Sequence, residues 1–187
     1  MAFVGSTELV LLEIAAVAFV GLTIAQLSRV LIREKFRYSD LTKKISWAPP
    51  SFLFGVVWSL MYLILQPIAL YRIRILGNWE AGVNQTALIL FWVLQLALVL
   101  YNFLYILNLW LGFVAVLVSL GLAITTTILF FPLDTAAGIL MLPLDVWLLF
   151  ATILALAVAI KNPNPTRVAP SIKARVRTQV TNRQQTF

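Results

Sequence analysis

The stretch ALILFWVLQLALVLYNFLYILNLWLGFVAVLVSLGLAITTTILFF, residues 87–131, decides the fold. It runs for 45 residues without a charged side chain, and Asn108 and Gly112 interrupt it near its middle. A single helix of that length would measure about 68 Å at about 1.5 Å per residue. The hydrocarbon of a bilayer is only about 30 Å thick. The stretch therefore predicts two membrane-spanning helices joined by a tight turn near Asn108.

Three more apolar stretches, of 21 to 25 residues each, lie outside this run. Each is long enough to cross a membrane as a helix, which needs roughly 20 apolar residues. The chain is 61% apolar and 11% charged, whereas soluble domains are about half apolar and about a quarter charged. We therefore predict an all-α, polytopic membrane protein, a five-transmembrane-helix bundle in one domain (residues 1–162). The five predicted spans are Leu9–Ile32, Ser51–Tyr71, Ala87–Leu107, Leu109–Phe131 and Ala136–Ile160.

The chain contains neither cysteine nor histidine. It therefore lacks thiolate nucleophiles, the commonest general base and the commonest metal ligand. No catalytic residue, metal site or required cofactor is predicted, and thermal acid–base or metal catalysis is disfavoured.

The basic residues predict the orientation in the membrane. Twelve of the 14 lie at or after the end of the first span or after the fifth, and two, Arg72 and Arg74, lie after the second. With five spans, the rule that cytoplasmic loops are positive places the N-terminus outside and the C-terminus in the cytoplasm. The twelve are Arg29, Arg33, Lys35, Arg37, Lys43, Lys44, Lys161, Arg167, Lys173, Arg175, Arg177 and Arg183.

Two polar segments flank the predicted bundle. The loop Arg33–Pro50 is expected to lie against the membrane and over the mouth of the bundle. Residues 163–187 form a basic tail, expected to be disordered and to lie on lipid; docking to an acidic partner is the alternative. The net charge of +7 is attributed to topology and anionic lipid rather than to nucleic acid.

Aromatic side chains form two stripes. Phe54, Trp58 and Tyr62 are four residues apart, and Trp147, Phe150 and Ala151 share a face of the fifth span. If the two faces converge, they form an aromatic slot suited to a planar hydrophobic ligand. The alternative is that these rings only pack helices together or face lipid.

Three segments resemble the translocator protein family, whose bacterial members are called tryptophan-rich sensory proteins. In the first, a Trp-x-Pro-Pro element precedes a Phe-x-x-Val-Trp-x-x-x-Tyr helix. The other two resemble the third and fifth spans of the family. The segments are KISWAPPSFLFGVVWSLMY (Lys44–Tyr62), LQLAL (Leu94–Leu98) and PLDVWLLFAT (Pro143–Thr152).

This resemblance implies a five-helix bundle, commonly dimeric, that binds porphyrins, haem-like tetrapyrroles and other flat apolar molecules. It implies that Trp58 and Trp147 wall the pocket, and it adds Trp47 and Gln95 to the predicted ligand-binding residues. A bacterial cell membrane or an organelle membrane is the implied location. The roles implied are sensing, sequestration, transport or light-dependent porphyrin breakdown.

Several polar positions of the family are apolar in this chain. Val99, Leu144 and Ala155 stand where the family usually has Asn, Tyr and Asn, and Asn102 replaces a Trp. Because a buried hydrogen bond contributes about 1 kcal/mol, we expect a more apolar ligand or weaker binding.

We therefore predict a membrane protein that binds a planar hydrophobic ligand, foremost a tetrapyrrole. Its predicted partners are the lipid bilayer, this small molecule and a second copy of the chain. One alternative is a scaffold or assembly factor whose pocket is filled by its own side chains. The other is an enzyme that degrades porphyrin by Trp-dependent photochemistry.

Other polar and small residues lie within the predicted spans. Asp145 falls well inside the fifth span and must face a cavity, pair with another group or be protonated. Gln66, Gln95 and Asn102 are typical of contacts between helices. Small residues recur every four positions, which favours close helix packing or a dimer contact. These are Ala115, Ser119, Ala123 and Thr127, and then Ala151, Ala155 and Ala159.

Overall fold

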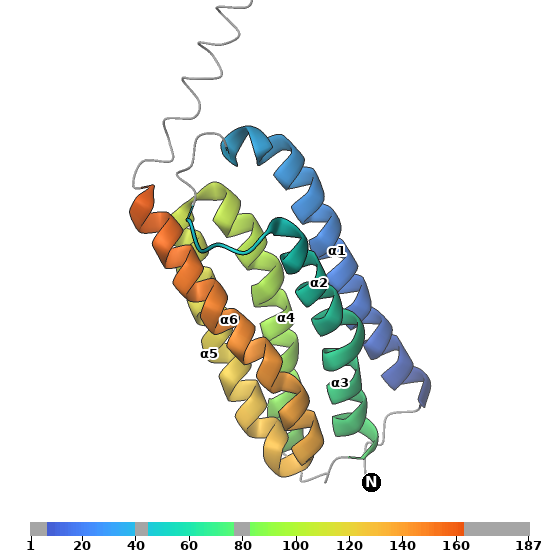
Figure 1. The fold of residues 1–187 in the computed structure, drawn as a ribbon. Coiled ribbons are helices and arrows are strands. Elements are labelled where there is room, and N and C mark those ends of the chain that lie inside the picture. The colour runs from blue at the N-terminus through green and yellow to red at the C-terminus, as the bar shows by residue number, and fades with distance from the viewer. Residues whose placement is uncertain (1–6, 40–44, 77–82, 163–187) are drawn as a thin grey trace, which may run out of the picture.

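The computed structural model describes residues 7–39, 45–76 and 83–162, and all of its regular structure is helical. Figure 1 shows an elongated bundle whose helices run side by side. The basic tail lies outside the described residues. The elements are α1 (Thr7–Ser39), α2 (Ser51–Leu60), η1 (Met61–Leu65), α3 (Gln66–Ile75), α4 (Val83–Leu107), α5 (Leu109–Leu133) and α6 (Thr135–Lys161).

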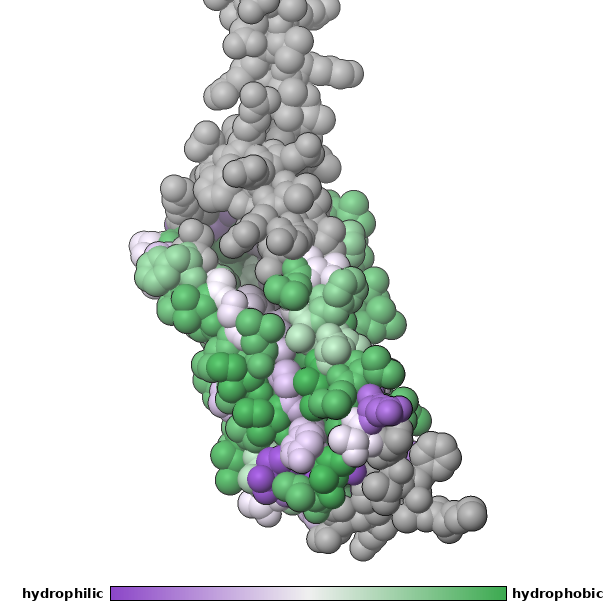
Figure 2. All heavy atoms as spheres, turned by 90° about the vertical axis from the view of Figure 1, so that its right-hand side faces the viewer, coloured by the Kyte–Doolittle hydropathy of each residue, from purple (hydrophilic) through white to green (hydrophobic). Residues whose placement is uncertain are grey.

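Four helical rods in the described ranges are long and apolar enough to cross a membrane. One of them combines α2, η1 and α3 without a break, and the other three are α4, α5 and α6. The helix α1 has 33 residues and contains the predicted first span. Hydrophobic residues cover the middle of the face seen in Figure 2, while hydrophilic residues gather toward its lower end.

The helix α1 continues beyond the predicted end of the first span. Arg33–Ser39, predicted as part of a loop, belong to α1. That part of the loop prediction was wrong. Arg, Glu and Lys are good helix formers, and no Gly or Pro occurs between Arg33 and Pro49. The helix therefore has no local signal to stop where its apolar residues end.

The helices close into a ring. The helix α1 packs against α3 and α4; α4 packs against α5, α5 against α6, and α6 against α3. The small-residue rows lie inside this ring, since Ser119, Ala123, Ala151, Ala155 and Ala159 are all buried. They therefore serve packing within the bundle.

Single polar residues form the two tight turns of the second half. Asn108 lies between α4 and α5 in an extended conformation, and its side chain accepts a hydrogen bond from the Trp110 backbone N–H at 2.8 Å. Asp134 does the same between α5 and α6, accepting from the Ala137 N–H at 2.7 Å. These caps satisfy N–H groups that a helix start leaves without partners. The turn predicted near Asn108 is confirmed.

The turn at Asn108 depends on a close approach at Gly112. A Cβ atom on Gly112 would lie 2.7 Å from the Tyr105 Cα atom, whereas one on Gly121 would meet nothing within 4 Å. Because a backbone atom cannot easily move aside, we expect Gly112→Ala to lower the free energy of unfolding by about 1–3 kcal/mol. Gly121→Ala, in the same helix, is the control and should unfold at the parent temperature or above it. Equal melting temperatures for both variants would contradict this account of the turn.

The second rod contains a widened turn at its middle. In η1 the Gln66 N–H bonds to the Met61 carbonyl, one residue further back than in an α-helix. Pro67 follows directly; it has no N–H and crowds the carbonyl four residues before it. The π-turn accommodates that proline without breaking the rod.

Two ion pairs hold one end of the bundle together. Arg72 donates from Nε and Nη2 to the two carboxylate oxygens of Asp134, at 2.8 and 3.0 Å. Arg74 pairs with Glu13 of α1, with Nε to Oε2 at 2.7 Å. The end of α3 is thereby joined both to α1 and to the α5–α6 turn.

Candidate ligand site

Six aromatic side chains from three segments form one cluster between α2 and α6. Trp147 lies at its centre, with ring centroids 5.2 Å from Phe54, 6.4 Å from Trp58 and 5.5 Å from Phe150. Trp58 stacks on Tyr62 at 5.6 Å, and Trp47 meets Phe150 at 6.1 Å. The two stripes read from the sequence therefore converge.

The course of the second rod makes room for these rings. The helix α6 packs closely against α3 and η1, but its backbone contact with α2 is slight. The space that opens toward α2 is filled by large side chains. Trp47 comes from the segment before α2 and is half exposed, at 50%. The cluster thus extends from the bundle interior at Tyr62 to the surface at Trp47.

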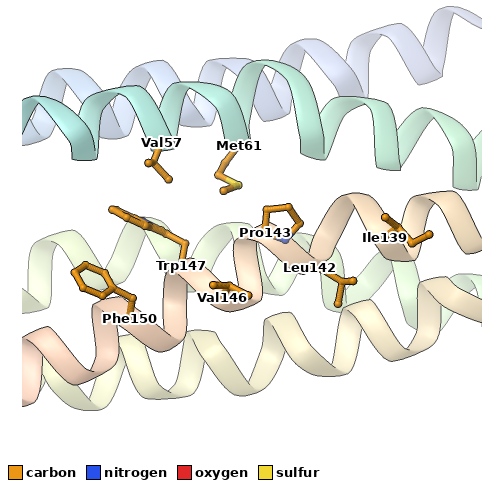
Figure 3. Close-up of a pocket in the computed structure, with 8 residues that line it drawn as sticks. All are labelled: Val57, Met61, Ile139, Leu142, Pro143, Val146, Trp147 and Phe150. Carbon is orange, nitrogen blue, oxygen red and sulfur yellow. The ribbon is translucent and has the colours of Figure 1, made fainter. Parts of the chain in front are cut away.

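An apolar groove of about 690 Å³ runs beside the cluster between α2–η1 and α6. Val57 and Met61 project across it toward Trp147 and Pro143 (Figure 3). Trp147 and Phe150, inclined to each other by 32°, form its aromatic end. The remaining lining residues are Ile139, Leu142 and Val146.

Trp58 and Trp147 do not stand as parallel walls. Their rings touch edge to face, with an angle of 89° between the planes. A flat ligand between two parallel rings needs about 7 Å between their planes, since stacked carbon atoms lie about 3.5 Å apart. In this geometry Trp147 borders the groove, and the Trp58 ring supports it from the side.

Three other predicted site residues lie in the bundle interior. Tyr62 is buried and packs so closely on α1 that a Cβ atom on Gly21 would fall among the Tyr62 side-chain atoms. The buried Gln95 side chain donates to Gln66 of α3 at 2.6 Å. Ala151 is buried on α6.

Several buried polar atoms near these residues make no hydrogen bond within the described part of the chain. They are the hydroxyl oxygen of Tyr62, Nε2 of Gln66, Oε1 of Gln95 and Nε1 of Trp147. Buried polar groups are normally paired, so these atoms can serve the polar edge of a bound molecule or of water. Leu144 and Ala155, two positions where family polar residues are absent, are buried and apolar.

The sequence pointed to the aromatic residues but not to the groove. Val57, Met61, Ile139, Leu142 and Val146 line it, yet they are ordinary apolar residues among many. Nothing in their type or spacing distinguishes them from residues that face lipid, so only the tertiary arrangement reveals them.

The chain matches the TspO/MBR family over residues 10–160, a range that includes every residue of the aromatic cluster. The chain belongs to the TspO/MBR family. It is 33% identical over 157 residues to Protein CrtK of Rhodobacter capsulatus, and the match covers 81% of this chain and 94% of that protein. The resemblance read from the three sequence segments is thus confirmed. This TspO/MBR protein is a multi-pass membrane protein by family and by its apolar helices.

Asp145 stands apart from the aromatic cluster. Its carboxyl group lies beside the Thr127 hydroxyl of α5, and the buried Oδ1 of Asp145 has no hydrogen-bond partner in the described ranges. The ion pairs found there, Arg72–Asp134 and Arg74–Glu13, do not include it. An ionised acid in the membrane is costly, so Asp145 does not anchor the fold by its charge.

We therefore expect the Asp145→Asn variant to insert into the membrane as well as the parent does. Its unfolding temperature should equal that of the parent or exceed it. Asn keeps the size of the side chain and removes the cost of a buried charge. Thermal unfolding in detergent measures this, with insertion scored from the membrane fraction. Failure of the Asn variant to fold would mean that Asp145 belongs to a buried ion pair, for which Arg29 is the first residue to test.

Proposed function

We propose that this protein binds a planar hydrophobic ligand, a tetrapyrrole, for sensing, sequestration or transport. The observation that carries the proposal is the convergence of Trp47, Phe54, Trp58, Tyr62, Trp147 and Phe150 into one cluster beside an apolar groove. Flat aromatic walls bind flat aromatic molecules by offset stacking. Membership of the TspO/MBR family supports a tetrapyrrole over other flat molecules.

In this proposal the ligand stacks on the aromatic end of the groove rather than between the two tryptophans. Trp147 and Phe150 supply the stacking surface, and Phe54 and Trp58 hold Trp147 in place from its edges. The groove is lined by apolar side chains, so the macrocycle is held by dispersion and burial. Few polar contacts are offered in this groove.

A second candidate function is that of a membrane scaffold without a ligand. The edge-to-face contact between Trp58 and Trp147 favours it, because the rings fill the space between α2 and α6 themselves. A scaffold of this kind needs its aromatic side chains for stability alone.

Titration of the purified protein with protoporphyrin IX separates the two candidates. Ligand binding predicts saturable quenching of tryptophan fluorescence together with a saturable change in the porphyrin absorption band. The scaffold predicts only the linear, non-saturating partition of porphyrin into detergent. A mutant chain with Trp147 replaced by Ala provides the matched control for partition.

We further propose five spans, with α1 as the first, in a bacterial cell membrane. The N-terminus lies outside and the C-terminus in the cytoplasm. The length of α1 and its packing against α3 and α4 support a fifth span. The two arginines at the outer end are both paired with acids, so the excess positive charge lies on the other side, as cytoplasmic loops require.

Reporter fusions test this topology. An enzyme that is active only in the cytoplasm should work when fused after Phe187 and fail when fused before Met1. A reporter active only outside should give the reverse pattern. Termini on the same side would mean an even number of spans, and α1 would then not cross the membrane.

A further inference from the structure

Two hollows on the surface of α6 meet at Ile139. The first is the apolar groove beside Val57 and Met61, and the second, of about 520 Å³, is lined by Arg72, Asp134 and Thr135 among others. Ile139 lines both. The two hollows therefore adjoin at Ile139, and we call the pair the furrow: it is apolar beside α2 and η1 and polar at its Arg72 end.

The apolar part has the depth of one membrane leaflet. It follows α6 from Ile139 to Phe150, which is about 16 Å at about 1.5 Å per residue. Half of the bilayer hydrocarbon is about 15 Å. The furrow opens outward, since Val146 in its floor is 67% exposed. A chain lying in it would have its polar end where lipid headgroups lie.

The polar end offers both signs of charge. Arg72 donates from Nε and Nη2 to Asp134, which leaves Nη1 outside this ion pair, and the Arg72 side chain is 33% exposed. Asp134 accepts those two bonds and one from the Ala137 N–H. The Ala136 N–H also lies close to this carboxylate, and 11% of the Asp134 side chain stays exposed at the hollow. This arrangement suits a headgroup carrying an anion and a hydrogen-bond-donating cation side by side.

We propose that the furrow holds one phosphatidylethanolamine molecule from the leaflet at the Arg72 end. One acyl chain lies in the apolar groove, the phosphate accepts from Nη1 of Arg72, and the primary ammonium donates to Asp134. Phosphatidylglycerol offers no cation to Asp134, and the quaternary ammonium of phosphatidylcholine has no N–H to donate. This site goes beyond the proposed tetrapyrrole function and does not require it. The acyl chain lies in the groove whose aromatic end is proposed to bind the tetrapyrrole, so the two ligands compete for Trp147 and Phe150.

Native mass spectrometry on protein purified from vesicles tests the proposal. The vesicles contain equal amounts of phosphatidylethanolamine, phosphatidylglycerol and phosphatidylcholine with identical acyl chains. We expect one retained lipid per chain, with phosphatidylethanolamine favoured about tenfold over each of the others, which corresponds to about 1.4 kcal/mol. Equal retention of the three lipids would overturn the headgroup assignment.

A matched pair of variants tests the groove. Val146→Trp places a bulky ring in the furrow, whereas Ile153→Trp places the same ring on an exposed position of α6 outside it. With both variants folded by circular dichroism, the Val146 variant should retain about tenfold less phosphatidylethanolamine than the Ile153 variant. Equal retention would show that the lipid is held elsewhere on the surface. If the Val146 variant does not fold, Leu142→Phe, also in the groove, replaces it and must show the same loss.

Discussion

Trp147→Ala should weaken protoporphyrin IX binding by at least about tenfold, a loss of about 1.4 kcal/mol. Trp147 is the only cluster residue in ring contact with Phe54, Trp58 and Phe150 together, and it also borders the groove. An aromatic contact contributes about 0.5–1.5 kcal/mol beyond its buried area. The alanine variant loses this stacking and also the surface that the indole ring covers. The dissociation constant from a fluorescence or absorption titration measures the effect.

Trp110→Ala is the control for this prediction. Trp110 is 44% exposed, and its ring contacts Phe113 rather than the cluster. It should bind porphyrin with the parent affinity. The porphyrin affinity of Trp58→Phe should lie between those of the Trp147→Ala and Trp110→Ala variants, because Trp58 supports the Trp147 ring without lining the groove. If the Trp147→Ala variant bound porphyrin with the parent affinity, Trp147 would not belong to the ligand site.

Asp134→Ala should lower the free energy of unfolding by roughly 1–3 kcal/mol. The lost helix cap contributes about 1 kcal/mol, and the lost ion pair contributes less than a buried one because the Arg72 side chain is 33% exposed. Asp134 caps α6 and binds two N–H groups of Arg72, and its side chain is only 11% exposed. Asn can still cap the helix, so Asp134→Asn should lose only the contribution that the ion pair with Arg72 makes to the free energy of unfolding. Thermal or denaturant unfolding of the three proteins separates the two contributions. Equal stability of parent and Ala variant would contradict the role of this turn.

The same residue predicts a pH dependence. The hydrogen bonds from Arg72, with that from the Ala137 N–H, hold the pKa of Asp134 below the usual range of a carboxyl group. A lowered pKa in the folded state stabilises the fold above the unfolded pKa of about 4. That contribution is lost as the pH falls from there through the folded pKa. The difference in free energy of unfolding between the parent and the Ala variant should therefore be largest at neutral pH. It should shrink as the pH falls below about 4.

The turns and the helices were predictable because each depends on local chemistry. The uncharged run of residues 87–131 is too long for one span, and Asn108 is both polar and a good helix cap. The structure places the turn there. The end of α1 was not predictable from the apolar pattern, because Arg33–Ser39 carry four charged residues but still form a helix.

The π-turn and the ion pairs lie beyond such local reasoning. Pro67 signals a disturbance of the second rod, but its sequence does not say whether the helix kinks, breaks or widens. Arg72 and Asp134 are 62 residues apart, and their pairing depends on how α3 meets the α5–α6 turn. Sequence alone assigns both arginines only to one side of the membrane.

The candidate site was predictable in composition but not in geometry. The periodicity of Phe54, Trp58 and Tyr62 places them on one face, and the family resemblance pairs that face with Trp147. The angle between the Trp58 and Trp147 rings depends on how far α2 stands from α6, which no sequence pattern records. That angle is what moves the proposed stacking surface from the space between the tryptophans to the groove.

The proposed ligand site is tested most directly by the fluorine NMR spectrum of protein labelled with fluorotryptophan, recorded during titration with protoporphyrin IX. The six tryptophans give separate signals, each assigned by a single substitution to Phe. A porphyrin stacked at the aromatic end of the groove shifts the Trp147 signal most strongly. Smaller shifts are expected for Trp58, which contacts Trp147, and for Trp47, which contacts Phe150. The Trp110 signal should stay in place. Uniform small shifts of all six signals, or a largest shift at Trp110, would contradict binding at this cluster.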